Sequence, residues 1–183
     1  MNQNEFEKNI KDLISHIGEN AGREGLKDTP GRVFKAYEHL FSGYKENPEN
    51  VLTVFDDEKY DEMIVCKNIE FYSMCEHHML PFFGVAHIGY IPNGKIIGLS
   101  KLPRIVEIYS RRLQNQERLT SQVASCLKKL LDPKGVAVVM EAKHLCMMAR
   151  GVEKQQSEVT TSSLNGQFKE YAHTRSEFMN LIR

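Results

Sequence analysis

The chain of 183 residues has no excess of basic charge and no long apolar run. Its 24 Lys and Arg residues balance 24 Asp and Glu residues, whereas general nucleic-acid binders carry a strong basic excess. The balance argues against that class but leaves room for a local basic pocket. No apolar stretch approaches the length of a membrane span, and the opening residues MNQNEFEKNI lack an apolar signal core. We therefore expect a cytoplasmic protein.

Cysteine is scarce, with four residues in the whole chain. In a cytosolic protein, cysteines more often serve as free thiols or metal ligands than as disulfides. Cys66 and Cys126 fall in apolar, regularly patterned segments and are expected in the core. Cys75 and Cys146 each belong to a short cluster that also contains histidine.

Apolar periodicity predicts helices and strands in the order helix, helix, strand, strand, helix, helix, strand, strand, helix. Because the strands come in pairs, the pattern favours an α+β fold with an antiparallel four-stranded sheet and a helical pair inserted between the strand pairs. The expected strands are 63–73, 82–91, 136–147 and 158–169, with a short run at 96–99. The length fits one domain over residues 1–183, with an N-terminal helical region at 1–45 and the sheet and its helices at 63–183.

Several local signals refine this interpretation. Asn4 with Glu7 is typical of a capping pair for the first helix. Thr29, followed by proline, predicts the cap of the second helix, and Ser100 that of the third. Residues 45–61 are polar and acidic and predict a surface excursion.

The two cysteine and histidine clusters predict a metal site. Cys75 and His78 are three residues apart, which lets both side chains converge in a tight turn after a strand. His144 and Cys146 are two apart, so they would share one face of a strand. Thiolate and imidazole donors favour zinc over magnesium or calcium, and three ligands with an open position are typical of catalytic zinc. The alternative is that Cys75 and Cys146 are core thiols and His78 is a surface residue. That alternative would be favoured for a single cluster, but two clusters with suitable spacing favour a metal site.

Two histidines remain beside the three candidate ligands. Zinc lowers the pKa of its bound water to about 7, which indicates zinc-assisted hydrolysis. His77 and His144 are therefore candidates for the proton transfers that accompany such a reaction, unless they are merely buried or support the ligands. Glu76 is expected to be structural or solvated.

A group of basic residues lies at the start of the third predicted helix. The start of this helix combines free backbone amides with a hydroxyl and two cations, from Ser100, Lys101 and Arg104. A further cation, Arg150, follows the second cysteine and histidine cluster. Their coincidence with the metal clusters indicates phosphate binding rather than ordinary surface charge. Two cations early in the second helix could add to the site from a neighbouring subunit: Arg32 and Lys35.

Gln116 and Glu117 form a third group. A buried carboxylate can accept two hydrogen bonds in the pattern that guanine presents through its N1–H and 2-amino group. A helix-capping role for Glu117 is an equal alternative at this point.

Six motifs of the chain resemble the GTP cyclohydrolase I family, in family order over nearly the whole length. They are REGL at 23–26 with DTP at 28–30 and Arg32; SMCEHH at 73–78; GYIP at 89–92; IGLSKL at 97–102; Gln114 with QERLT at 116–120; and His144 with Cys146 and RG at 150–151.

The resemblance implies conversion of GTP and water into 7,8-dihydroneopterin triphosphate and formate, the first step toward folate or tetrahydrobiopterin. It implies zinc held by Cys75, His78 and Cys146, with His77 and His144 assisting proton transfer during attack at C8 of guanine. It also implies roles for residues at the substrate: Ser100 at the ribose; Gln116 and Glu117 at the guanine; and Lys101, Arg104 and Arg150 at the triphosphate, with Arg32 and Lys35 as helpers.

The resemblance further implies a tunnelling fold that assembles as a homodecamer of two stacked pentameric rings. Strands from five subunits would form a shared barrel, with active sites at subunit interfaces. The residues are compatible with this, because four strands cannot close a barrel within one chain and their exposed edges need covering.

The chain departs from the family at Asn115, where an apolar residue is usual, and this departure could alter substrate affinity. Two alternatives to the proposed enzyme stay open at this stage. One is a related pterin- or purine-binding protein of the tunnelling fold, which would lack the Cys-Glu-His-His cluster present here. The other is a non-catalytic, zinc-stabilised assembly module, in which the spare histidines would be replaceable.

Overall fold

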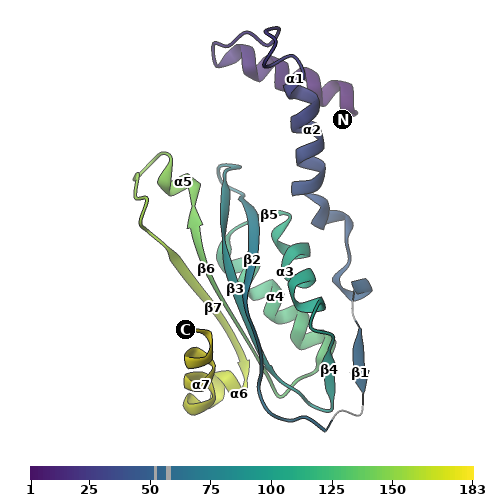
Figure 1. Cartoon of the computed structure of the whole chain (residues 1–183), viewed down its shortest axis with the longest axis vertical. Coiled ribbons are helices and arrows are strands. Elements are labelled where there is room, and N and C mark those ends of the chain that lie inside the picture. Colours follow the sequence, from purple (N-terminus) through teal and green to yellow (C-terminus); the bar gives the residue numbers. More distant parts are fainter. Residues whose placement is uncertain (52, 57–58) are drawn as a thin grey trace. The chain divides into compact units, whose positions relative to one another are not determined.

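The computed structural model describes residues 1–51, 53–56 and 59–183 (Figure 1). It divides into two compact units, Met1–Ser42 and Gly43–Arg183. The prediction of one domain over the whole chain stays a prediction. Within the described residues, no helix is both long and apolar enough to cross a membrane.

The N-terminal unit consists of two packed helices, α1 (Gln3–His16) and α2 (Thr29–Leu40). Phe6 of α1 meets two aromatic rings of α2 edge to face, with centroid distances of 5.5 Å to Phe34 and 5.9 Å to Tyr37. These edge-to-face contacts pack the two helices of this unit against each other.

The cap of α1 lies two residues before the predicted one. The Asn2 side chain accepts a hydrogen bond from the Glu5 backbone N–H at 3.0 Å, and the Glu5 carboxylate accepts one from the Asn2 N–H at 2.8 Å. The prediction of Asn4 and Glu7 is therefore wrong. The same Asn-to-Glu spacing occurs at both places, and the helix begins at the earlier one.

Two other predicted caps also differ. Asp28 is the cap residue of α2, whereas Thr29 is already helical and Pro30 lies in the first turn. Ser100 does precede α3 (Lys101–Ser110), but its backbone, with φ −64° and ψ −12°, is itself helical. A capping hydroxyl usually requires extended backbone, and within the described chain Ser100 makes no side-chain capping bond.

The main sheet of the second unit has five strands in the order β5-β2-β3-β6-β7. Four of them pair antiparallel: β2 (Ile64–Cys75), β3 (Pro81–Ile91), β6 (Gly135–His144) and β7 (Val159–Gly166). The fifth, β5 (Leu113–Gln114), runs parallel to β2. The α+β class is thus confirmed, but the sheet is mixed and five-stranded rather than purely antiparallel and four-stranded. A two-residue strand is too short to produce a periodic signal.

A second, two-stranded sheet pairs β1 (Val54–Asp56) with β4 (Lys95–Ile97). The predicted excursion at 45–61 is therefore partly ordered, and it also contains the 3-10 helix η2 (Pro48–Val51). Residues 52, 57 and 58 of that segment lie outside the described residues.

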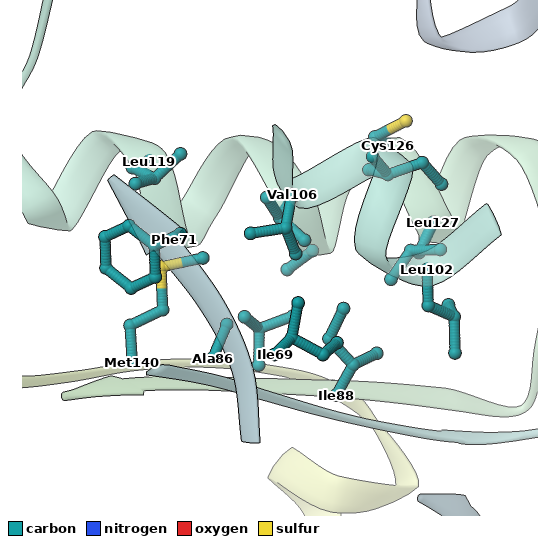
Figure 2. Packing of buried hydrophobic residues seen from close by; sticks show 14 of the residues in the cluster. Ile69, Phe71, Ala86, Ile88, Leu102, Val106, Leu119, Cys126, Leu127 and Met140 are labelled. Carbon is teal, nitrogen blue, oxygen red and sulfur yellow. The ribbon is translucent and has the colours of Figure 1, made fainter. Parts of the chain in front are cut away.

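The core lies between the sheet and two helices, α3 and α4 (Gln116–Leu131) (Figure 2). Strand side chains alternate between the faces of a sheet, so one set of strand residues meets these helices. The opposite face of β6 packs against α6 (Gln167–Glu170) and α7 (Ala172–Ile182). The helix-side cluster labelled in Figure 2 contains Ile69, Phe71, Ala86, Ile88, Leu102, Val106, Leu119, Cys126, Leu127 and Met140.

Candidate metal centre and active site

Three side chains from separate places in the second unit meet at the end of the main sheet. Cys75 is the last residue of β2, His78 lies in the turn that follows, and Cys146 belongs to α5 (Leu145–Met148). Their candidate ligand atoms all lie within 4.8 Å of one another. The structure thus brings together the three residues that the sequence predicted as metal ligands.

The turn after β2 is closed by backbone hydrogen bonds. The Cys75 N–H donates to the Leu80 carbonyl at 2.9 Å, and the Met79 N–H donates to the Cys75 carbonyl at 2.8 Å. Met79 has a φ of 52°, a left-handed conformation uncommon for a residue other than glycine. This tight closure brings the Nδ1 atom of His78 to 3.8 Å from Cys75 Sγ.

The second cluster reaches the site differently from the prediction. β6 ends at His144, and Cys146 lies in the single helical turn of α5. The expectation that His144 and Cys146 share a strand face is therefore wrong. Both still line the same cavity, because the chain turns between them.

The donor set fits a zinc ion. Burial, with the neighbouring Cys75 as the next cause, raises the pKa of the Cys146 thiol. A bound cation would offset this effect by favouring the thiolate form. Two sulfur donors and one imidazole nitrogen are zinc ligands, and three protein ligands leave one position open.

A cavity of about 220 Å³ adjoins the three candidate ligands. Its lining combines histidine, amide, carboxyl and apolar side chains, so it can hold a group with both polar and apolar surface. The residues that line it are Cys75, His77, His78, Phe82, Gln114, Asn115, Gln116, Glu117, His144, Cys146, Met147 and Val159.

His144 is held on one side by an aromatic ring and on another by an amide. Its ring lies parallel to Phe82, its partner across β3 and β6, with the centroids 4.7 Å apart. Its Nε2 atom lies 2.7 Å from Gln116 Oε1. The Gln116 Nε2 atom donates to the carbonyls of Met140, at 3.0 Å, and Val159, at 2.8 Å.

These contacts assign the protonation of the neutral His144 ring. Because Gln116 Nε2 donates to two carbonyls, its Oε1 must be the atom that faces His144, and Oε1 can only accept. His144 therefore carries its proton on Nε2 and keeps Nδ1 as an acceptor. Burial lowers the pKa of His144, which favours this neutral form.

The other spare histidine, His77, lines the same cavity but is largely exposed, and its Nδ1 lies 3.9 Å from Cys75 Sγ. Glu117 is also exposed at the cavity, whereas Gln116 is buried and its amide is engaged by protein groups. The structure thus places Glu117 where a ligand could reach its carboxylate.

An interaction that the sequence analysis missed holds the metal-binding turn. Glu76 accepts hydrogen bonds from Arg118 and from Asn115, and the Arg118 contact, foremost, keeps the pKa of the Glu76 carboxyl low. Asn115 also caps α4. An asparagine directly before a helical stripe is a recognised cap signal and could have been found in the sequence.

The predicted phosphate-binding residues are divided between distant places. Arg150 lies at the metal site, with Nη1 3.3 Å from His78 Nε2. Ser100, Lys101 and Arg104 lie at the start of α3, after β4, and Figure 1 shows β4 and α5 at opposite ends of the main sheet. In the part of the chain described, none of these three lines the cavity.

The remaining two predicted cations belong to the N-terminal unit. Arg32 and Lys35 lie on α2, and Arg32 forms an ion pair with Asp28 at 3.2 Å. Their part in a substrate site stays a prediction.

Comparison with known proteins finds one matching family model and relatives that align along nearly the whole chain. Residues 6–183 match the family model described as GTP cyclohydrolase I. A GTP cyclohydrolase 1 of Wolinella succinogenes is 57% identical over 97% of this chain and 96% of its own length, and one of Leptospira biflexa is 56% identical over 97% and 98%. Among solved structures, the apo form of the archaeosine synthase QueF-Like gives a TM-score of 0.47 at 18% identity, covering 57% of this chain and 93% of that one.

The family match spans both units, and the two relatives align along nearly the whole length of each chain. The matched range includes the cysteine and histidine clusters, the cavity and the start of α4. The chain therefore belongs to the GTP cyclohydrolase I family.

Proposed function

We propose that the protein is a zinc-dependent enzyme that converts GTP and water into 7,8-dihydroneopterin triphosphate and formate, the first step toward folate or tetrahydrobiopterin. The observation that carries this proposal is the convergence of Cys75, His78 and Cys146 on a cavity that also contains His77 and His144. Family membership and relatives named GTP cyclohydrolase 1 support the same activity.

Each candidate group has a role that follows from its surroundings. Zinc held by Cys75, His78 and Cys146 would supply the Lewis acidity that makes water a nucleophile near neutral pH. His144 is proposed to accept a proton at Nδ1, since its Nε2 proton is held by Gln116. Exposed His77 can exchange protons with solvent.

We propose that the substrate spans the cavity and the surface beside it. Glu117 would accept hydrogen bonds from the guanine edge, with Gln116 beside it contributing mainly through His144. Arg150, next to His78, would bind the triphosphate.

The remaining anion-binding residues are proposed to come from a neighbouring subunit. Ser100 and Lys101 lie at the start of α3, a helix of 10 residues and about 15 Å whose other end leads toward the cavity, and Arg104 lies one turn further along it. A second copy of the chain could supply them, and Arg32 and Lys35, to the same substrate. We therefore propose active sites at subunit interfaces, in the homodecamer that the family resemblance implies. The cytoplasmic location stays a prediction.

The direct test is incubation of the purified, zinc-loaded protein with GTP. We expect a pterin chromophore and formate in equal amounts, abolished by a chelator and restored by zinc. Cys146→Ser is the matched control, because it removes one ligand and should give neither product. Zinc-loaded protein that leaves GTP unchanged would overturn the proposed function.

A further inference from the structure

Asn115 connects the start of α4 to the turn that carries two of the metal ligands. Its Oδ1 atom accepts a hydrogen bond from the Arg118 backbone N–H at 2.8 Å, which caps the helix. Its Nδ2 atom donates to Glu76 Oε1 at 3.1 Å. These partners fix the orientation of the amide, because only its oxygen can accept from an N–H and only its nitrogen can donate to a carboxylate.

Glu76 lies in the metal-binding turn, directly after Cys75 and two residues before His78. The Glu76 backbone N–H donates to the Gln114 carbonyl at 2.9 Å, and Arg118 binds both oxygens of the Glu76 carboxylate. The turn is therefore attached to the start of α4 through its backbone and its side chain. Bidentate, charge-assisted contacts of this kind restrict geometry strongly.

Arg118 is itself held by the segment before α4. Its Nε atom donates to Gln114 Oε1 at 2.9 Å, and its Nη2 atom donates to the Leu113 carbonyl at 3.1 Å. Arg118 thus fixes the Glu76 carboxylate against β5, and Asn115 supplies a further donor to one of its oxygens. Glu76 Oε1, the oxygen that Asn115 contacts, lies 3.8 Å from His77 Nε2. The position of this carboxylate therefore also affects His77, the histidine proposed for proton exchange.

On the basis of the proposed zinc site, we propose that Asn115 is a positioning residue for the metal centre. Through Glu76 it holds the turn between Cys75 and His78 in the geometry that binds the ion. An apolar residue at this position would offer neither the donor to Glu76 nor the acceptor for Arg118. Asn115 therefore joins α4 to the metal-binding turn through a side-chain hydrogen bond to Glu76.

Asn115→Asp separates this role from helix capping. The variant keeps the size of the side chain and the acceptor for Arg118, and a negative charge at a helix start is favourable. It replaces the donor to Glu76 with a second carboxylate, whose repulsion displaces the turn. Loss of groups that orient metal ligands typically costs about 10–100-fold in metal affinity, and we expect a loss in that range.

The measurements are zinc affinity by competition with a chromophoric chelator and the absorption spectrum of the Co²⁺-substituted protein. Asn115→Asp should weaken zinc binding and alter the cobalt–thiolate bands, while the unfolding midpoint of the metal-free protein stays close to that of the wild type. Asn2→Asp makes the same exchange at the cap of α1 and should leave zinc affinity and the cobalt spectrum unchanged.

A second substitution tests the pathway through Glu76. Adding Glu76→Gln to Asn115→Asp supplies an amide that can donate to the new carboxylate and still accept from Arg118. We expect the double variant to bind zinc more tightly than Asn115→Asp alone, a coupling that a double-mutant cycle measures. Absence of this rescue would overturn the proposed pathway.

The outcomes separate this inference from the proposed function. Wild-type affinity and an unchanged cobalt spectrum in Asn115→Asp would overturn the positioning role. A wild-type protein that binds neither Zn²⁺ nor Co²⁺ would overturn the metal centre and, with it, the role of Asn115. A wild-type protein that binds zinc but leaves GTP unchanged would overturn only the proposed function, because the metal measurements still decide the role of Asn115.

Discussion

His144 and Gln116 share a hydrogen bond of 2.7 Å that determines which nitrogen of the histidine can act as a base. The Gln116 amide nitrogen faces two carbonyls, so its oxygen accepts the His144 Nε2 proton. The free Nδ1 atom is then the only ring position that can take up a proton. A buried amide therefore determines the chemistry of a neighbouring residue without needing to contact the substrate.

Gln116→Met tests this relationship. The variant keeps an unbranched side chain of similar length but removes both the acceptor for His144 and the donor to the carbonyls. We expect kcat to fall by about 10–100-fold with a smaller change in KM, because the orientation of His144 is lost while the ligands remain. Steady-state kinetics with GTP check this, with zinc content measured in parallel. An unchanged kcat would contradict the role given to Gln116.

His144→Ala should separate proton transfer from metal binding. The side chain is not among the three candidate ligands, so zinc content should stay at the wild-type level. Turnover should fall by about 10²–10⁴-fold, the usual contribution of general acid–base catalysis. Metal analysis and product formation are measured on the same sample. Full activity in this variant would show that His144 is not the proton acceptor.

His87 gives the fold a pH dependence outside the active site. It is buried in β3, its Nδ1 atom accepts a hydrogen bond from the Asn68 N–H at 3.4 Å, and burial, the foremost cause, lowers its pKa. Glu141 and Lys67 act on it in opposite directions. The neutral ring is thus favoured in the folded state, while the unfolded chain takes up a proton near pH 6.5.

Stability should therefore decrease as the pH falls from about 6.5 through the lower folded pKa of His87. His87→Gln removes the titrating group, so its unfolding midpoint should change less between pH 7.5 and pH 5 than that of the wild type. Thermal unfolding of both proteins at these two pH values checks this, since other titrating groups contribute equally and cancel in the comparison. Identical pH dependence in the two proteins would contradict the assignment.

Local periodicity predicted much of the fold because long elements repeat their signal many times. β3, which the sequence predicts at 82–91, begins one residue earlier and ends at the predicted residue. Short or single-residue features were missed, because β5 has two residues and the cap of α1 depends on which of two asparagines begins the helix. Such features are decided by tertiary contacts or by small differences between local alternatives.

The candidate site, like the fold, could be predicted from the sequence only in part. The residues that converge on a metal could be predicted from two clusters with suitable spacing. The role of Gln116 could not, because its contacts to Met140 and Val159 are 24 and 43 residues away in sequence. They form only when α4 packs across β6 and β7, so no local pattern encodes them.

Mixed oligomers test whether one substrate site uses two subunits. The Lys101→Ala/Arg104→Ala double variant removes the cations at the start of α3, and Cys146→Ser removes a metal ligand at the opposite end of the sheet. Each protein should be nearly inactive alone. Suppose that the cations at the start of α3 and the metal ligands of one site come from neighbouring subunits. Random co-assembly should then restore about a quarter of the sites, because an intact site needs its metal ligands from one variant and its cations from the other.

The matched control is a mixture of Cys75→Ser and Cys146→Ser. These two ligands converge within one chain, so every metal site in that mixture lacks a ligand and no activity should return. Co-expression followed by an activity assay with GTP gives the comparison directly. If the first mixture stays as inactive as the control, the cations at the start of α3 do not complete the site of another subunit, and the interface model would fail.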